Sequence, residues 1–160
     1  MSNEKKILSI LVENYSGTLS KVAGLFTRRG YNIDSLNVAE TQDPKISRIT
    51  VAVTGDSYVI EQITKQLNKL INVIKVVNVS ENSSVQKELM MIKVRADNSK
   101  RTEIIQIANL FKADIADVSS KNLIVVITGD ETKNNAFLEI IKPFGIVEIT
   151  RTGPAALERG

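Results

Sequence analysis

The hydrophobic pattern of the first half of the chain switches between two periods. Residues 7–12 form an almost unbroken apolar run, and Ile49, Val51 and Val53 alternate with polar residues, as in a strand that buries one face. Over residues 19–26, apolar side chains recur every three or four positions, which predicts an amphipathic helix. The first half therefore combines strands with helices.

Six elements follow from this pattern, in the order strand, helix, strand, strand, helix, strand. Their expected ranges are 7–12, a helix from about Thr18 to Arg29-Gly30, 32–38, 49–53, a helix that Asp56 caps, and 73–79. This order predicts an antiparallel sheet covered on one side by two helices, which is the ferredoxin-like βαββαβ arrangement.

The second half repeats the order of elements. Strands are expected at 89–94, 115–119, 123–128 and 146–150, with helices around Ile104, Ala108 and Phe111 and around residues 136–141. Two short echoes support the repeat: A-G-L-F at 23–26 against A-N-L-F at 108–111, and V-T-G-D at 53–56 against I-T-G-D at 127–130. We therefore predict an α+β chain with domains at 1–79 and 88–160, joined by a polar linker at 80–87.

Composition removes several classes of function. The 160 residues include neither cysteine nor histidine, which excludes disulfides and removes the commonest metal ligand and the commonest general base. A stand-alone enzyme and a metal site are therefore not expected. No apolar run approaches the roughly 20 residues of a membrane span, so the sequence predicts a soluble cytoplasmic protein.

Nucleic-acid binding is also not expected. The formal net charge is only +3, and the basic residues are scattered along the chain. A ferredoxin-like sheet binds single-stranded RNA through aromatic residues on its strands, but residues 7–12 and 49–53 contain none.

The loop after the first strand is the strongest candidate for a binding site. Asn14 ends the strand, and Ser16, Gly17, Thr18 and Leu19 lead into the helix. The start of a helix leaves amide groups unpaired beside the positive end of its dipole, which favours a carboxylate. An Asn side chain can accept from an ammonium group or donate to a carboxylate, so these residues suit a free amino acid.

The corresponding loop of the second half, residues 96–100, lacks glycine, and its helix starts with Lys100 and Arg101. A ligand cannot approach that backbone as closely. We therefore expect the first half to sense the small molecule, while the second half packs, pairs or contacts a partner.

Residues 13–36 resemble the regulatory, or small, subunit of acetohydroxyacid synthase, also called acetolactate synthase. The segment E-N-Y-S-G-T-L-S-K-V-A-G-L-F-T-R-R-G-Y-N-I-D-S-L is similar to that family's pattern E-N-x-x-G-x-L-x-R-V-x-G-L-F-x-x-R-G-Y-N-I-x-S-L. The resemblance continues through residues 43–44, 47–50 and 61–67 and reaches the tail at 151–153 and 156–160.

The resemblance implies an N-terminal ACT domain, which is a ferredoxin-like amino-acid sensor, followed by a C-terminal domain of related topology. It implies a non-catalytic subunit that activates a separate large subunit, which condenses pyruvate, and that mediates feedback inhibition by valine or by leucine or isoleucine. Thiamine diphosphate, Mg and FAD are expected on that catalytic partner and no cofactor on this chain.

The resemblance also implies where the effector binds. In this family the effector lies between the ACT domains of a homodimer, where the first loop of one subunit faces the second strand of the other. On this sequence the loop contributes Asn14, Ser16, Gly17, Thr18 and Leu19, and the facing strand contributes Asn32 and Ile33. The alternative hypothesis is a free-standing ACT-domain sensor that acts on another target, such as a transcriptional regulator.

Overall fold

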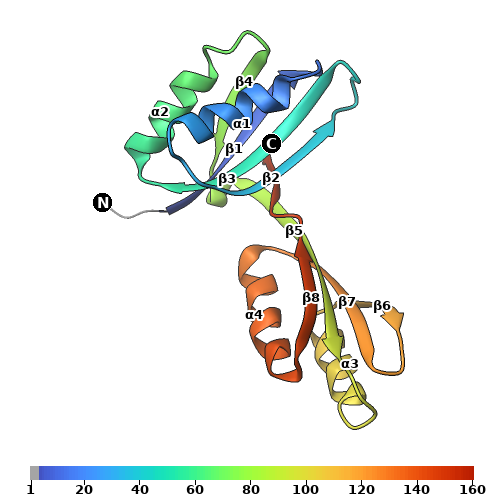
Figure 1. Ribbon diagram of the computed structural model, residues 1–160. Helices are drawn as coiled ribbons and strands as arrows, with labels where there is room; N and C mark the ends of the chain where they lie inside the picture. The colour runs from blue at the N-terminus through green and yellow to red at the C-terminus, as the bar shows by residue number, and fades with distance from the viewer. Residues whose placement is uncertain (1–3) are drawn as a thin grey trace. The chain divides into compact units, whose positions relative to one another are not determined.

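A computed structural model describes residues 4–160 as two units of the same topology (Figure 1). The first unit comprises the chain up to Val85 together with Ala155–Gly160, and the second comprises Gln86–Pro154. Each unit is an antiparallel sheet with two helices on one face, so the predicted α+β class and the repeated ferredoxin-like topology are confirmed.

The first unit has the six predicted elements. They are β1 (Glu4–Glu13), α1 (Thr18–Arg28), β2 (Ile33–Glu40), β3 (Ile46–Gly55), α2 (Ser57–Leu67) and β4 (Val73–Val79). The sheet order is β2-β3-β1-β4, which leaves β2 and β4 at its edges.

The core of the first unit lies between its sheet and its helices. Leu8, Ile10 and Val12 alternate along β1 and pack with Phe26 of α1 and Ile63 of α2. Because every second residue of a strand points to the same side, this alternation determines which face the helices cover (Figure 1).

The second unit repeats the arrangement. Its elements are β5 (Ser84–Arg95), α3 (Arg101–Leu110), β6 (Asp114–Val118), β7 (Asn122–Gly129), α4 (Glu131–Ile141) and β8 (Ile146–Arg151), with a short 3₁₀ turn at Lys142–Phe144. The strand order is β6-β7-β5-β8. Phe111 and Phe137 meet edge to face in its core with ring centroids 5.2 Å apart.

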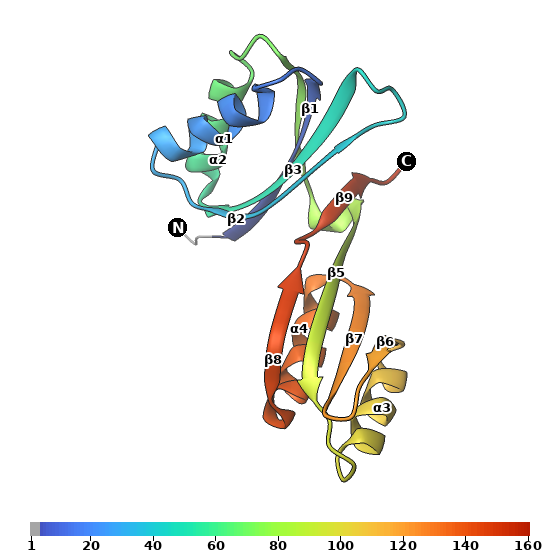
Figure 2. The same cartoon turned by 45° about the vertical axis from the view of Figure 1, so that its right-hand side comes forward.

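The structure differs from the predicted boundaries in two places. The segment 80–87, predicted as a linker, forms a 3₁₀ turn at Glu81–Ser83 and then the start of β5. The last residues, predicted in the second domain, form β9 (Ala155–Glu158; Figure 2). This strand belongs to the first unit and contacts β4. The reason is burial, because Ala156 packs into an apolar cluster with residues of the first sheet.

Within residues 4–160, no helix has the length and apolar character that crossing a bilayer requires.

Candidate functional site

The loop between β1 and α1 is a tight turn fastened by its own backbone. The Tyr15 amide donates to the Glu13 carbonyl at 2.9 Å, and the Thr18 amide donates to the Tyr15 carbonyl at 3.2 Å. The Thr18 hydroxyl also donates to the Glu13 carbonyl at 3.2 Å. Thr18 is buried and holds the turn, whereas Ser16 is exposed at its tip.

Gly17 supplies the backbone conformation that this turn needs. Its φ angle of +88° lies in the left-handed region, which costs L-amino acids energy and costs glycine little. A Cβ atom built on Gly17 would meet no atom within 4 Å. The position therefore requires glycine for its φ angle, and the space beside it stays open.

The first amides of α1 are available to a ligand. The Lys21 amide donates to the Gly17 carbonyl, but the amides of Leu19 and Ser20 have no acceptor among residues 4–160. No side chain caps this helix and no acidic residue lies in its first turn. The positive end of the helix dipole is thus uncompensated, and an anion bound there would be stabilised.

Asn14 is held at one end of the sheet by hydrogen bonds of its side-chain and backbone amides. Its Nδ2 donates to the Pro44 carbonyl at 2.9 Å and to Glu40 Oε1 at 3.3 Å, and its backbone amide donates to the Lys45 carbonyl. Both Nδ2 hydrogens are thereby engaged, and Oδ1 is left as the group that can accept from a ligand's ammonium. Glu40 adds a carboxylate beside it.

The sequence reasoning did not assign Glu40 or Pro44 to this site. Their contact with Asn14 depends on strand register across 26 to 30 residues, and neither residue carries a motif that indicates it.

Asn32 and Ile33 lie at the opposite end of the same sheet. Ile33 pairs with Val53 and Glu40 pairs with Ser47, so the length of β2 separates Asn32 from the Asn14 end. That length is about 24 Å at the usual rise per residue. Within one copy of the chain, the structure brings together Asn14, Ser16, Gly17, Thr18 and Leu19, but not Asn32 and Ile33.

Asn32 and Ile33 make few contacts that would hold a ligand within one copy. Asn32 is exposed, and its Nδ2 donates to Asp34 Oδ1 at 3.5 Å. Ile33 is half-buried against the core of the first unit. Leu19, by contrast, is 42% exposed on the first turn of α1, where it offers an apolar surface beside the free amides.

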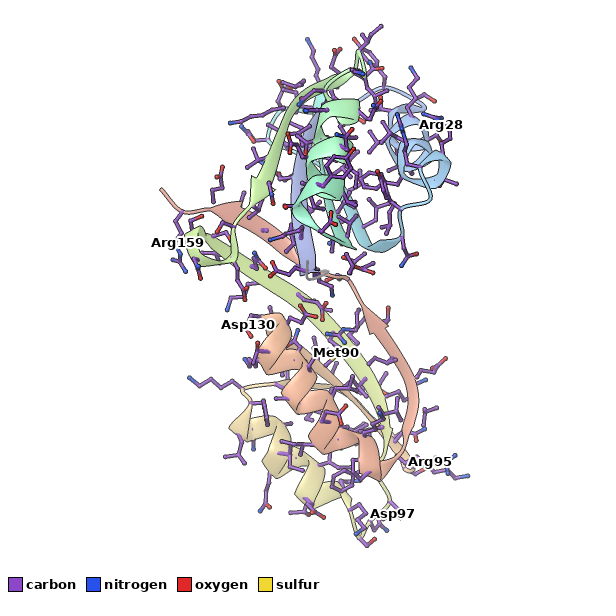
Figure 3. The ribbon with its side chains drawn as sticks, turned by 90° about the vertical axis from the view of Figure 1, so that its left-hand side faces the viewer. Arg28, Met90, Arg95, Asp97, Asp130 and Arg159 are labelled. Carbon is purple, nitrogen blue, oxygen red and sulfur yellow. The ribbon has the colours of Figure 1, made fainter. Side chains whose placement is uncertain are left out.

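The equivalent loop of the second unit closes on itself. Asp97 Oδ1 accepts from the Ser99 hydroxyl at 2.7 Å and from the amides of Ser99 and Lys100 at 3.1 and 3.2 Å. The Ser99 hydroxyl is the main reason that the pKa of Asp97 lies below its ordinary value, with these amides adding to it. The Asp97 carboxylate thus engages the amides of the loop that leads into α3, although α3 itself has no side-chain cap (Figure 3).

Arg101 closes the second loop further. Its Nη2 donates to the carbonyl oxygens of Ala96 and Ser119, which ties the start of α3 to the hairpin loop. A ligand would have to displace both the Asp97 carboxylate and this guanidinium. In the loop at Gly17, by contrast, no acidic side chain accepts from the loop amides and no arginine ties the helix start to another loop.

The part of the chain that the structure describes holds no group of three or more acidic side chains that could bind a metal ion.

The chain is similar to known proteins over its whole length. The family described as "AHAS small subunit-like ACT domain" matches residues 8–75, and the family described as "Small subunit of acetolactate synthase" matches residues 87–160. The probable acetolactate synthase small subunit of Methanothermobacter thermautotrophicus is 52% identical over 161 residues, which cover 100% of this chain and 96% of that protein.

Two further relatives agree. The probable acetolactate synthase small subunit of Archaeoglobus fulgidus is 49% identical, and the match covers 98% of each chain. Among solved structures, the crystal structure of the acetolactate synthase small subunit from Thermotoga maritima matches with a TM-score of 0.90 and 40% identity, over 98% of each chain.

Proposed function

The chain belongs to the family of acetolactate synthase small subunits, and on this premise we propose that it activates the catalytic large subunit and confers feedback inhibition by a branched-chain amino acid. We take valine as the effector, with leucine and isoleucine as its nearest competitors. The observation that carries the proposal is the match to small subunits over the whole chain. Its role in the complex is regulatory, and the chemistry belongs to the partner, which would hold thiamine diphosphate, Mg and FAD.

Two copies of the chain would form the effector site. β2 is an edge strand, and Leu36 and Val38 on it are 36% and 43% exposed. They pair with Val51 and Ile49, which face the core, so both side chains point to the helix side. A second copy that pairs its β2 with this one would bury them and would remove an exposed strand edge.

Antiparallel pairing of the two β2 strands would also complete the site. In a two-fold arrangement, the start of β2 in one copy lies beside the end of β2 in the other. Asn32 and Ile33 of the second copy would then face Glu40 and the Asn14 loop. This accounts for the separation of the two groups of site residues within one copy.

Each part of a free amino acid has a complementary group in such a site. The amides of Leu19 and Ser20 would receive the carboxylate, while Asn14 Oδ1 and the Glu40 carboxylate would accept from the ammonium. Leu19 and the second copy's Ile33 would contact the branched side chain. Charge-assisted hydrogen bonds of about 1.5–3 kcal/mol each give an affinity in the micromolar-to-millimolar range.

Binding between two copies links the ligand to regulation. A ligand that favours one dimer geometry shifts the population by its differential affinity, typically by about 1–3 kcal/mol. The large subunit would respond to that geometry. Discrimination among valine, leucine and isoleucine rests on single methylene groups, each of which changes binding by about 1–3 kcal/mol.

Reconstitution with the catalytic subunit of the same organism tests this function. We expect the chain to raise the rate of acetolactate formation and valine to reverse part of that increase. Asn14→Ala should keep the activation and raise the valine concentration for half-inhibition at least about tenfold, because it removes one charge-assisted hydrogen bond.

Asn98→Ala, in the closed loop of the second unit, is the matched control and should behave like the wild type. Unchanged valine sensitivity in Asn14→Ala would place the effector elsewhere. A chain that neither binds nor activates the catalytic subunit would contradict the proposed partner.

A further inference from the structure

The face of the first sheet turned away from α1 and α2 is buried at one end of β1, β3 and β4, although no described helix of the first unit covers it. Ile7, Ala52 and Val79 on this face are each at most 6% exposed. Thr50 is also buried here, whereas the sequence pattern predicted only one buried face for this strand. The cover comes from the last residues of the chain, because Ala156 packs against Ile7, Ala52 and Val79.

Strand register arranges this face in three rows centred on β1. The rows are Ala52, Ile7 and Val79, then Thr50, Ser9 and Val77, then Arg48, Leu11 and Lys75. Ala156 covers the first row. The first row is therefore apolar and lies under Ala156, whereas the third row carries two charged residues and is more exposed.

Two cations flank the third row. Arg48 and Lys75 lie on the strands to either side of Leu11. Their backbones are about 9.6 Å apart, which is two strand spacings. Neither forms an ion pair within the described part of the chain. Two unpaired cations that line the same hollow favour a bound anion, since each attracts it.

A buried hydroxyl orients one of these cations. Arg48 Nη1 donates to Ser9 Oγ, and Ser9 is only 4% exposed. This hydrogen bond fixes the guanidinium on the sheet and leaves its other N–H groups free to bind a carboxylate in the bidentate geometry that suits arginine.

The end of the chain completes a hollow over these residues. The hollow has a volume of about 220 Å³, which is roughly the space of seven water molecules in the liquid and less than the pockets that hold drug-sized ligands. Leu11 and Val77 form an apolar floor, and Leu157 and Glu158 form the wall contributed by the tail. Charged groups thus stand beside an apolar surface in a small space.

We propose that this hollow is a second ligand site, which binds a small organic carboxylate with a branched apolar body. The carboxylate is held between Arg48 and Lys75, and the apolar body lies on Leu11 and Val77 under Leu157. The site is distinct from the β1–α1 loop, since it lies on the opposite face of the sheet from the helices. It goes beyond the proposed function and does not depend on it.

Isovalerate is the probe, because it carries a carboxylate and a branched apolar body without an ammonium group. We expect saturable binding of isovalerate to the full-length chain in calorimetry, with amide shifts in ¹H–¹⁵N spectra at Ser9, Leu11 and Lys75. Isovaleramide, which lacks the charge, and inorganic phosphate, which lacks the apolar body, should each bind at least about tenfold more weakly.

Lys75→Gln and Arg48→Gln should each weaken isovalerate binding at least about tenfold. Lys65→Gln is the matched control, since Lys65 is an exposed lysine of α2 away from the hollow. Arg48→Gln also removes the hydrogen bond to Ser9 and could perturb the fold. Lys75 is exposed, so Lys75→Gln tests the site without that effect.

The two sites are separated by crossing the variants. Asn14→Ala should keep isovalerate binding, and Lys75→Gln should keep valine inhibition. Valine is the second ligand to be measured in the Asn14→Ala chain. If valine binds this hollow more tightly than isovalerate does, its ammonium group is accepted by the Glu158 carboxylate. The proposal is overturned by absence of saturable binding, by full affinity in Lys75→Gln, by equal binding of phosphate, or by shifts confined to residues 14–19.

Discussion

Among single residues, Gly17 shows why one backbone angle governs the candidate site. Its left-handed φ turns the chain so that the first amides of α1 face solvent. The Asn14 side chain at the start of this loop is fixed by its bonds to Pro44 and Glu40. The site therefore depends on conformation at one position and on hydrogen bonding at the other.

Gly17→Ala should destabilise the first unit by about 1 kcal/mol, because alanine pays the cost of a positive φ. It should also weaken valine binding, since the loop amides shift. Urea denaturation followed by circular dichroism gives the stability and calorimetry gives the affinity.

Gly24→Ala is the contrasting control within the same helix. Gly24 lies in the interior of α1, and an added Cβ would meet only Arg28 Nη1, at 3.5 Å. Alanine there should stabilise the protein by about 0.5–1 kcal/mol. Equal effects at the two glycines would contradict the conformational role of Gly17.

Among the elements, the helix starts differ in how their first amides are satisfied. Asp56 accepts from the Val59 amide at 2.9 Å, and Asp130 accepts from the Lys133 amide at 2.8 Å. The cap at Asp56 was predicted and is confirmed, and Asp130 is its counterpart in the repeated segment I-T-G-D. Gly55 before the first cap is also sterically constrained, because a Cβ atom there would lie 2.9 Å from Val59 Cγ1.

Removing these caps gives a prediction at the scale of the helix. Asp56→Ala and Asp130→Ala should each destabilise their unit by about 1 kcal/mol. Thermal unfolding measured at matched concentrations tests this, with Asp117→Ala as the control, because Asp117 is an exposed residue of β6 away from any helix start.

The elements that the sequence predicted are those with a long pattern. The helices and the strands of both sheets appear close to their expected ranges because their apolar residues recur over many positions. β9 was missed since four residues are too few for a period, and its contact with Ile7 joins positions at opposite ends of the chain. The segment predicted as a linker contains the start of β5, and its polar composition gave no strand pattern.

The candidate site was predictable to the extent that it is local. Residues 14–19 follow one another, so their proximity needs no tertiary information. Glu40 joins Asn14 only through strand register, which the sequence did not indicate. The position of Asn32 at the far end of β2 places it beyond reach within one copy, and the residue's role as an effector ligand stays a prediction.

For the whole molecule, the two units share one topology but differ in the loop before their first helix. In the first unit the Leu19 and Ser20 amides have no acceptor among residues 4–160, while in the second Asp97 accepts from the Ser99 and Lys100 amides and Arg101 ties the loop to Ser119. Units of this size bury a limited core, so pairing of copies would add stability as well as a binding site. The edge strand β2, with its exposed apolar side chains, is where such pairing would occur.

Val38→Lys tests the pairing of copies and its link to the effector. A lysine on β2 places a charge where an apolar side chain would be buried and blocks addition of another strand. We expect the dimer dissociation constant to rise at least about tenfold and valine binding to weaken in step, because the proposed site would take Asn32 and Ile33 from the second copy.

The control places the same substitution on an edge strand of the other unit. Val118 of β6 is 62% exposed, so Val118→Lys adds the same charge to an edge strand as Val38→Lys does and leaves β2 unchanged. Sedimentation velocity at several concentrations gives the dimer constant, and calorimetry at each concentration gives the valine affinity. A monomeric Val38→Lys chain that still bound valine as tightly as the wild type would show that one copy suffices. The pairing of β2 strands would then have no part in effector binding, and the uncapped start of α1 would have to hold the amino acid alone.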